Sequence, residues 1–292
     1  MNFQLKLPPV AIGGIGGSGT RLIADIIQAA GFFIGETLNH PLDNLYFTLL
    51  FKRPDWVKRF PSTEEIDIAI HLFQKAMTQG LHGKLSSSEI AYLEYLATLH
   101  NAAKSPTGAD RLIAQKIISS NAPDFSSHVG WGWKEPNTHI FLPEIARKIK
   151  NIRYIHVVRN GLDMAYSKNQ QQLRNWGEYI NNEPPAVNAA QASLSLDYWI
   201  KANQRAIQLG DSLLPNRFLL VNYDKLCSEP TTEIPRIIEF LEAKLSTHTI
   251  QEMNEMVAPI SVGRYQNHDT TVFTQHQLDA VTELGFDIET NR

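Results

Sequence analysis

The sequence predicts an α/β fold of three layers, in which helices cover both faces of a central, mostly parallel sheet. Short apolar runs alternate along the chain with longer stretches of helical periodicity, as expected for strands and helices in turn. Several of the runs end in glycine or in a charged residue. In open α/β sheets, ligands bind at these carboxyl ends of the strands. The chain has 292 residues, enough to bury a full α/β core. We therefore expect a single domain over residues 1–292.

Four apolar runs are expected to form core strands of the sheet, and residues 32–34 are a further apolar run. They are rich in Val, Ile, Phe, Tyr and Trp, residue types that favour strands. The runs cover residues 10–14, 32–34, 129–134, 153–158 and 217–223. Lys134 and Arg159 stand at or just after the ends of two of them, so that a parallel arrangement would bring both side chains to one edge of the sheet.

The helices are marked by periodicity and by their terminal residues. Ser62 with Glu65, and Ser86 with Glu89, have the spacing of capping boxes. Gly31 ends the first helix. Helices are expected over residues 20–30, 42–52, 62–79, 86–103, 139–149, 162–169, 192–208, 232–241 and 247–256.

Residues 38–122 lack a convincing strand pattern and form a helical insertion after the first strand and helix. Such insertions commonly form the wall or lid of a substrate pocket, and the alternative is that this one only extends the packing. Asn137 or Thr138 would cap the helix at 139–149. Residues 174–190 are expected to be a loop, because the segment NNEPP within them is a strong turn signal.

Composition excludes several classes of protein. Lys and Arg number 27 against 30 Asp and Glu, so the net charge of -3 draws the protein neither to nucleic acid nor to an anionic membrane. The single cysteine, Cys227, excludes a disulfide framework or a cysteine-rich metal site, and we expect an inert structural thiol. The ten histidines show no metal-ligand spacing. No apolar run is long enough to span a membrane and the first residues do not resemble a signal peptide, so a cytoplasmic location is expected.

The glycine-rich turn is the main functional motif. Residues 13–21 read GGIGGSGTR, and the N–H groups of such a turn and of the first helical turn point at one place, which suits a phosphate. Gly14-x-Gly16-x-x-Gly19 with Glu36 further along matches the dinucleotide fingerprint. The turn is also P-loop-like, although Thr20-Arg21 stands where a kinase has Lys-Ser/Thr. A turn without a ligand is the remaining interpretation.

Arg159 and Ser167 favour another interpretation of this turn, in which it belongs to a different class of nucleotide-binding protein. Arg159 follows the strand at 153–158, and Ser167 comes eight residues later. Arginine offers a planar fork to phosphate, and a hydroxyl on the following helix adds a donor. The chain thereby resembles the sulfotransferases that use 3′-phosphoadenosine 5′-phosphosulfate (PAPS), in which Ser-Gly-Thr holds the 5′-phosphosulfate and this Arg and Ser hold the 3′-phosphate. The alternative for Arg159 is that it merely pairs with Asp163.

Two more segments agree with this resemblance. FLLVNYDKLCSEP at residues 218–230 is similar to the family's strand ending in Tyr-Glu-Asp-Leu, and GRYQNH at residues 263–268 is similar to its C-terminal Gly-x-Trp-x-Asn-His. The resemblance covers residues 8–36 and 129–270, and it implies PAPS as donor, 3′,5′-ADP as product and no metal. The nucleotide-binding residues it implies are Gly16, Gly17, Ser18, Gly19, Thr20, Arg21, Arg159, Ser167, Tyr223, Gly263 and Arg264.

The chain departs from the family pattern in two places. Gly17 stands where the family usually has Lys or Arg before Ser-Gly-Thr, and Arg21 on the same junction could take over that role. The family's basic Arg-Lys-Gly triplet before the final element is absent, and Arg264 could substitute for it. These departures concern charge stabilisation more than the class of nucleotide.

The resemblance also implies catalytic residues. Lys134, in a Lys-Glu-Pro context similar to the family's Lys-Asp-Pro, would stabilise the leaving phosphate oxygen, and Arg21 would add charge. Glu36 resembles the base of protein-tyrosine sulfotransferases, shifted by one residue, with His40 and Asp43 as alternatives. A Glu36 that only caps the next helix is the competing interpretation.

The reaction implied is transfer of the sulfuryl group from PAPS to a hydroxyl or amine of a small-molecule or carbohydrate acceptor. The sequence indicates neither which acceptor nor which oligomeric state. Two alternatives stay open. An NAD(P)-dependent Rossmann oxidoreductase rests on the Gly14-x-Gly16-x-x-Gly19 pattern and Glu36, and a PAPS- or 3′,5′-ADP-binding module without catalysis rests on the missing lysine at Gly17.

Overall fold

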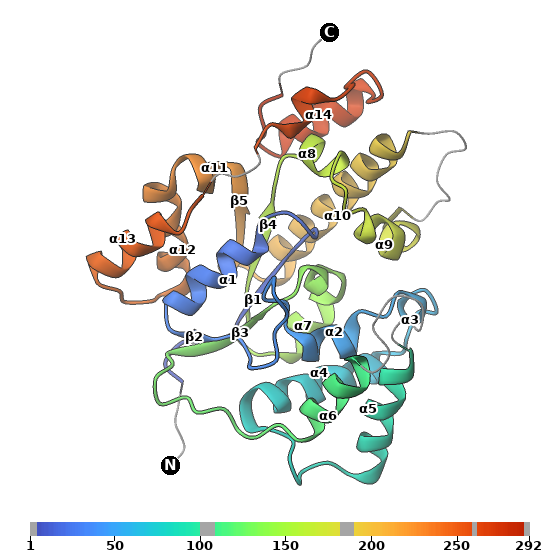
Figure 1. The fold of residues 1–292 in the computed structure, drawn as a ribbon, viewed down its shortest axis with the longest axis vertical. Helices are drawn as coiled ribbons and strands as arrows, with labels where there is room; N and C mark the ends of the chain where they lie inside the picture. The colour runs from blue at the N-terminus through green and yellow to red at the C-terminus, as the bar shows by residue number, and fades with distance from the viewer. Residues whose placement is uncertain (1–4, 100–108, 182–189, 259–261, 289–292) are drawn as a thin grey trace.

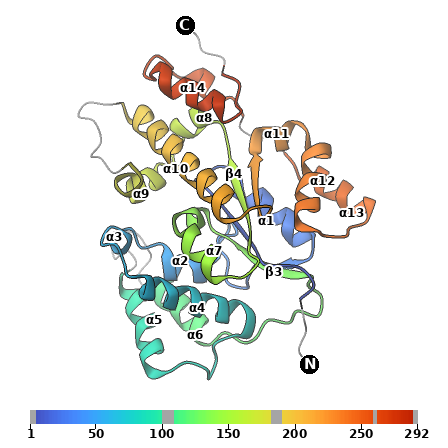
Figure 2. The ribbon, with the colours of Figure 1, turned by 180° about the vertical axis from the view of Figure 1, so that it is seen from behind.

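The computed structural model describes residues 5–99, 109–181, 190–258 and 262–288. Two expectations fall partly outside these ranges: the helix expected at 86–103, in its last four residues, and the turn signal at 181–185, in all but its first residue. The described chain forms a five-stranded sheet with helices on both faces (Figures 1 and 2).

The strands pair in parallel throughout this sheet, in the order β2-β3-β1-β4-β5. They are β1 (Val10–Gly14), β2 (Phe32–Phe33), β3 (Gly130–Lys134), β4 (Arg153–Val158) and β5 (Phe218–Asn222). The central strand is β1, whose Ile12 lies opposite Lys134 of β3 and Ile155 of β4. The glycine-rich turn after β1 therefore emerges between the carboxyl ends of two neighbouring strands.

The helices in the described part of the chain include both predicted capping boxes. At the start of α4, Ser62 and Glu65 cap each other's backbone N–H groups, and Ser86 and Glu89 do so before α5. The helices are α1 (Thr20–Ala29), α2 (Leu45–Phe51), α3 (Pro54–Val57), α4 (Thr63–Gln79), α5 (Ser87–Leu99), α6 (Ala109–Ile118), α7 (Leu142–Lys148), α8 (Gly161–Ala165), α9 (Gln171–Asn181), α10 (Gln191–Leu213), α11 (Tyr223–Ser228), α12 (Pro230–Leu241), α13 (Thr247–Glu255) and α14 (Gln275–Glu283), with 3-10 helices η1 (Pro136–Phe141) and η2 (Arg264–Asn267).

Alternate residues of the strands feed two hydrophobic cores, because successive side chains of a strand point to opposite faces. Val10 and Ile12 belong to the core under α1, α12 and α13. Ala11 and Tyr154 belong to the core under α2, α4, α7 and α10. The predicted three-layer α/β fold is confirmed.

The helical insertion consists of α2 to α6, which lie together below the sheet in Figures 1 and 2. An aromatic cluster joins it to the sheet: the rings of Phe47 and Phe73 contact that of Trp133, with centroids 5.8 and 5.0 Å apart. Within the described residues of 38–122 the only strand-like pairing is an isolated bridge between Leu38 and Asn44. The short helix α3 and the helix α6 were not expected from the sequence.

The expectation of a loop at 174–190 is wrong for residues 174–181, which belong to helix α9, whereas Ala190 lies just before the start of α10. Leu173, Trp176 and Ile180 recur at helical spacing, and both Trp176 and Ile180 are buried. The indole of Trp176 also donates a 2.6 Å hydrogen bond to Oδ1 of Asn137. The burial of Trp176 and its hydrogen bond to Asn137 stabilise this segment as a helix up to Asn181.

Two helix boundaries near the expected site also differ from prediction. Helix α8 ends at Ala165 rather than 169, since the Gln170 amide donates to the carbonyl oxygens of Ala165 and Ser167 at 3.1 and 2.6 Å and satisfies the end of the helix. The helix expected at 139–149 begins as the 3-10 helix η1. Its cap is Glu135, whose carboxylate accepts from the N–H of Asn137 at 2.6 Å, rather than Asn137 or Thr138.

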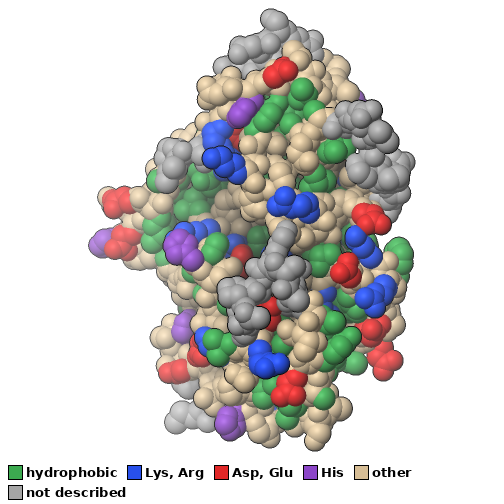
Figure 3. Space-filling view, turned by 45° about the vertical axis from the view of Figure 1, so that its right-hand side comes forward, with side chains coloured by type: hydrophobic (Ala, Val, Ile, Leu, Met, Phe, Trp, Pro, Cys, Tyr) green, Lys and Arg blue, Asp and Glu red, His purple; other side chains and the backbone are tan. Residues whose placement is uncertain are grey.

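Charged side chains of both signs are interspersed over the face shown in Figure 3. None of the helices described is long and apolar enough to cross a membrane.

Candidate active site

A cavity of about 530 Å³ lies at the carboxyl ends of the strands. It is bordered by the turn after β1, the end of β3, the residue after β4, the insertion and the start of α9. The residues that line it are Gly16, Gly17, Gly19, Thr20, Arg21, Pro41, Asp43, Lys52, Lys134, Glu135, Pro136, Arg159, Asn169, Gln171, Gln172 and Tyr223. Sheet-end crevices of this kind are where α/β proteins bind ligands.

The glycine-rich turn, part of which lines this cavity, contains donors that lack partners in the described part of the chain. Helix α1 starts after Gly19 without a side-chain cap, so the first N–H groups of the helix lack an intrahelical partner. The Ser18 hydroxyl is buried and has no hydrogen-bond partner among the described residues. A buried hydroxyl without a partner is costly, and an anion at the helix N-terminus would satisfy both groups.

Gly19 and Tyr223 show how closely this turn is packed. Gly19 has a φ of 96°, a conformation that side-chain-bearing residues rarely adopt. A Cβ atom at Gly19 would lie 2.0 Å from Cδ2 of Tyr223. The Tyr223 ring thus packs directly against the turn, and it also lines the cavity. Burial raises the pKa of Tyr223 to about 12.

Lys134 ends β3 with its side chain almost fully buried. Its Nζ donates to Oδ1 of Asp43 at 2.5 Å and to the carbonyl oxygen of Pro41 at 3.0 Å. Asp43 is held on the other side by Asn39, whose amide donates to Oδ2 at 2.9 Å. The loop before α2 therefore places a carboxylate directly against the lysine that ends a core strand.

Glu135 is a buried carboxyl in the same wall. Its pKa is raised to about 7, mainly by burial; the Lys52 ammonium works against this rise and the Asp43 carboxylate adds to it. Its two oxygens accept hydrogen bonds from the backbone and side-chain nitrogens of Asn137 at 2.6 and 2.7 Å. A group with this pKa changes charge near neutral pH.

Arg159 follows β4 and faces the turn. Its guanidinium donates to the carbonyl oxygen of Gly17 and lies 3.4 Å from Oδ2 of Asp163. The expected alternative, a pair between Arg159 and Asp163, is therefore present, and Arg159 lines the cavity as well. Asp163 also accepts from the N–H groups of Gly263 and Tyr265 at 3.0 and 2.9 Å, which joins the C-terminal element to the arginine.

Most of the chain matches a known protein family. Residues 8–247 match the model of the sulfotransferase family. The chain belongs to this family. No curated protein matches this sulfotransferase.

One of three similar solved structures supports the fold, with a TM-score of 0.50. The sulfotransferase domain of the olefin synthase from Synechococcus PCC 7002 is similar to this sulfotransferase with a TM-score of 0.50 at 14% identity, over 99% of this chain and 98% of that one. The sulfotransferase domain from the curacin biosynthetic pathway has a TM-score of 0.48 at 12% identity, over 97% and 100% of the two chains. Sulfotransferase STF9 from Mycobacterium avium has a TM-score of 0.48 at 12% identity, over 99% and 79%.

The structure brings together most, but not all, of the expected site residues of this sulfotransferase. Those that line the cavity are Gly16, Gly17, Gly19, Thr20, Arg21, Lys134, Arg159 and Tyr223. Ser18 is buried within the turn, and Gly263 is linked to Arg159 through Asp163. Of the three candidate bases only Asp43 lines the cavity; Glu36 and His40 are exposed and do not.

Ser167 and Arg264 also lie outside the lining. Because α8 ends early, Ser167 is not on the second turn of a helix, and its hydroxyl accepts from the N–H of Asn169 at 3.2 Å. Arg264 is exposed in η2. Asn169 lines the cavity in place of Ser167.

Sequence reasoning missed five polar residues of this site: Lys52, Glu135, Asn169, Gln171 and Gln172. Oε1 of Gln172 is buried without a partner among the described residues. The helical spacing of Leu173, Trp176 and Ile180 could have placed Gln172 on a helix. No local signal marks Lys52, which reaches the site only through the packing of the insertion.

Proposed function

We propose that this sulfotransferase transfers the sulfuryl group of PAPS to a hydroxyl or amine of a small-molecule or carbohydrate acceptor. The observation that carries the proposal is one cavity in which the uncapped start of α1 meets Lys134 and Arg159. Three sources of positive potential around one cavity suit a ligand with several anionic groups. PAPS has such groups at both its 5′ and 3′ positions.

The residues present fit the donor. The orphaned Ser18 hydroxyl and the N–H groups of the turn would hold the 5′-phosphosulfate, and Arg21 lies in the same lining. Arg159 would bind the 3′-phosphate, with Asn169 offering an amide at the place expected for Ser167. In this proposal Gly263 acts through its bond to Asp163, which orients the arginine.

In the reaction a bond forms between the acceptor atom and sulfur, the bond from sulfur to the 5′-phosphate oxygen breaks, and the acceptor loses a proton. We assign the stabilisation of the charge on the leaving oxygen to the Lys134 ammonium. We assign the proton to the carboxylate of Asp43, the one candidate base that lines the cavity. The short contact between these two side chains supports a site where both act on one reacting centre.

The experiment is calorimetric titration of the purified protein with 3′,5′-ADP and, separately, with NADH. We expect 3′,5′-ADP to bind and its affinity to fall at least tenfold in Arg159→Ala, because charge-assisted hydrogen bonds to phosphate are lost. The control Arg147→Ala removes an exposed arginine that pairs with Asp67 outside the cavity, and should bind normally. Binding of NADH alone would support the oxidoreductase, and 3′,5′-ADP binding without turnover of PAPS on any acceptor would support an inactive module.

A further inference from the structure

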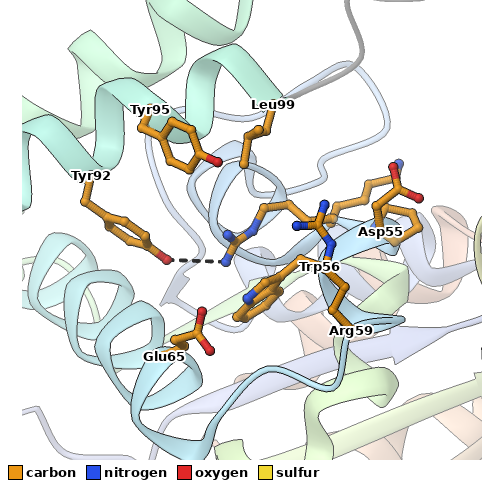
Figure 4. A pocket seen from close by; sticks show the side chains of 10 residues that line it. Asp55, Trp56, Arg59, Glu65, Tyr92, Tyr95 and Leu99 are labelled. Carbon is orange, nitrogen blue, oxygen red and sulfur yellow. Dashed lines mark hydrogen bonds between the residues drawn. The ribbon is translucent and has the colours of Figure 1, made fainter.

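A second cavity, of about 260 Å³, lies between α3, α4 and α5 of the helical insertion (Figure 4). Lys52, which lines the first cavity, lines this one as well. The two cavities therefore meet at a single side chain. The first cavity is the one that Lys134 and Asp43 line.

Arg53 gives the second cavity a buried cation. Its side chain is only 8% exposed, and its Nε donates to the carbonyl oxygen of Leu50 at 2.9 Å while an Nη donates to the hydroxyl of Tyr92 at 3.4 Å. Both acceptors are neutral, and within the described ranges no carboxylate lies within ion-pair distance of Arg53. Burial lowers the pKa of Arg53, and the neighbouring Tyr92 and Glu65 offset this only in part. A guanidinium has five N–H donors, so this charge is incompletely compensated.

The other charged groups of the cavity leave this imbalance in place. Arg59 is exposed at its edge and adds a second guanidinium. Of the acidic residues there, Glu65 is occupied with the start of α4, where its carboxylate accepts from the N–H of Ser62 at 2.8 Å. Asp55 is exposed. Cations therefore outnumber acids in the lining, three to two.

Aromatic and apolar side chains also line this cavity. Trp56 has its faces occupied, since the Arg53 guanidinium lies 3.7 Å from its ring centroid and Phe141 stacks on it. Tyr95 and Leu99 of α5 point into the cavity from above in Figure 4 and stay 57% and 47% exposed. These two side chains are free to pack against a flat or apolar body.

We propose that the second cavity binds the acceptor, and that the acceptor carries an anionic group, a carboxylate, sulfate or phosphate, beside a flat apolar body. Arg53 and Arg59 bind the anion, Tyr95 and Leu99 cover the body, and the reacting hydroxyl extends past Lys52 towards Asp43. This inference rests on the proposed function, because it names the class of acceptor for that reaction.

The test uses two probes that differ in one charge: 6-hydroxy-2-naphthoate and its uncharged amide. Each is titrated by calorimetry into the protein saturated with 3′,5′-ADP. We expect the carboxylate to bind about tenfold more tightly than the amide or better, as a charge-assisted hydrogen bond to arginine requires. The preference should disappear in Arg53→Gln and weaken in Arg59→Gln, whose exposed side chain can be changed without disturbing the core.

Lys58→Gln is the matched control, because Lys58 precedes Arg59, pairs with Glu178 and does not line the cavity. It should keep the full preference. Equal binding of the two probes, no binding of either, or a preference that is undiminished in Arg59→Gln would overturn the inference. The affinity for 3′,5′-ADP, measured first, reports separately on the donor site, so that a failure of the proposed function is recognised before the probes are added.

Discussion

The Nζ atom of Lys134 lies 2.5 Å from Oδ1 of Asp43, although 91 residues separate the two in the sequence. Lys134 is fixed by the end of a core strand and Asp43 by the loop that leads into the insertion. The pair thus joins the sheet, which carries the proposed nucleotide site, to the helices that form the second cavity.

Lys134→Ala should lower kcat at least a hundredfold, because a cation aimed in advance at a developing charge contributes several kcal/mol. The affinity for 3′,5′-ADP should change much less, since the turn and Arg159 remain. Turnover of PAPS and calorimetry measure the two quantities. Lys148→Ala, which removes a surface partner of Asp67, is the control. A Lys134→Ala enzyme with wild-type kcat would exclude the assigned role.

Asp43→Asn should lower kcat by about a hundredfold or more while 3′,5′-ADP still binds, because a general base contributes on that order. Glu36→Gln and His40→Gln should keep normal turnover, since both residues are exposed outside the cavity. The comparison is made on one acceptor under saturating PAPS. Loss of turnover in Glu36→Gln, with Asp43→Asn still active, would return the base to the residue that the sequence favours.

Gly19→Ala should destabilise the protein and disrupt the nucleotide site, because a Cβ there meets the Tyr223 ring at 2.0 Å on a backbone with positive φ. Gly83→Ala is the matched control: its φ is also positive, at 67°, but no atom lies within 4 Å of the added Cβ. It should cost only the backbone strain, about 1 kcal/mol. Urea unfolding should show Gly19→Ala to be lower in stability by roughly a further 1–3 kcal/mol. Equal losses would show that Tyr223 does not constrain the turn.

His156→Gln should flatten the pH dependence of stability. His156 is fully buried, its ring lies between Tyr154 and Asn203 at 2.8 and 2.9 Å, and burial lowers its pKa to about 4. Between that value and its ordinary pKa of 6.5, the unfolded chain binds a proton that the folded chain does not, so stability is lost as the pH falls through this window.

The size of this effect is about 1.4 kcal/mol per pH unit for one proton. Compared with His156→Gln, the wild type should therefore lose that much more free energy of unfolding per unit between about pH 6 and pH 4, measured by urea unfolding at each pH. His276→Gln changes an exposed histidine and should leave the wild-type slope unchanged. Parallel curves for the wild type and His156→Gln would contradict the burial of a neutral ring.

The sequence by itself determined the parts of this protein whose information is local. A glycine-rich turn between a buried strand and a helix needs particular residues at particular positions, because the backbone there takes conformations that few residues tolerate. The expected strands, and the presence of Gly16, Gly17, Gly19, Thr20 and Arg21 in one lining, follow from such local requirements. Lys134 and Arg159 were predictable too, since parallel strands end at one edge of a sheet.

Only the tertiary structure decided which side chains converge from separate elements. Glu36, His40 and Asp43 lie within eight positions of one another, yet the fold brings Asp43 alone to Lys134, because the loop before α2 is anchored on the end of β3 by the bond from the Asn44 N–H to the Lys134 carbonyl. Ser167 lies outside the cavity lining because the hydrogen bonds of Gln170 end helix α8 early. Lys52 lines both cavities because of how the insertion packs. These outcomes depend on contacts between residues far apart in the chain, which no local pattern records.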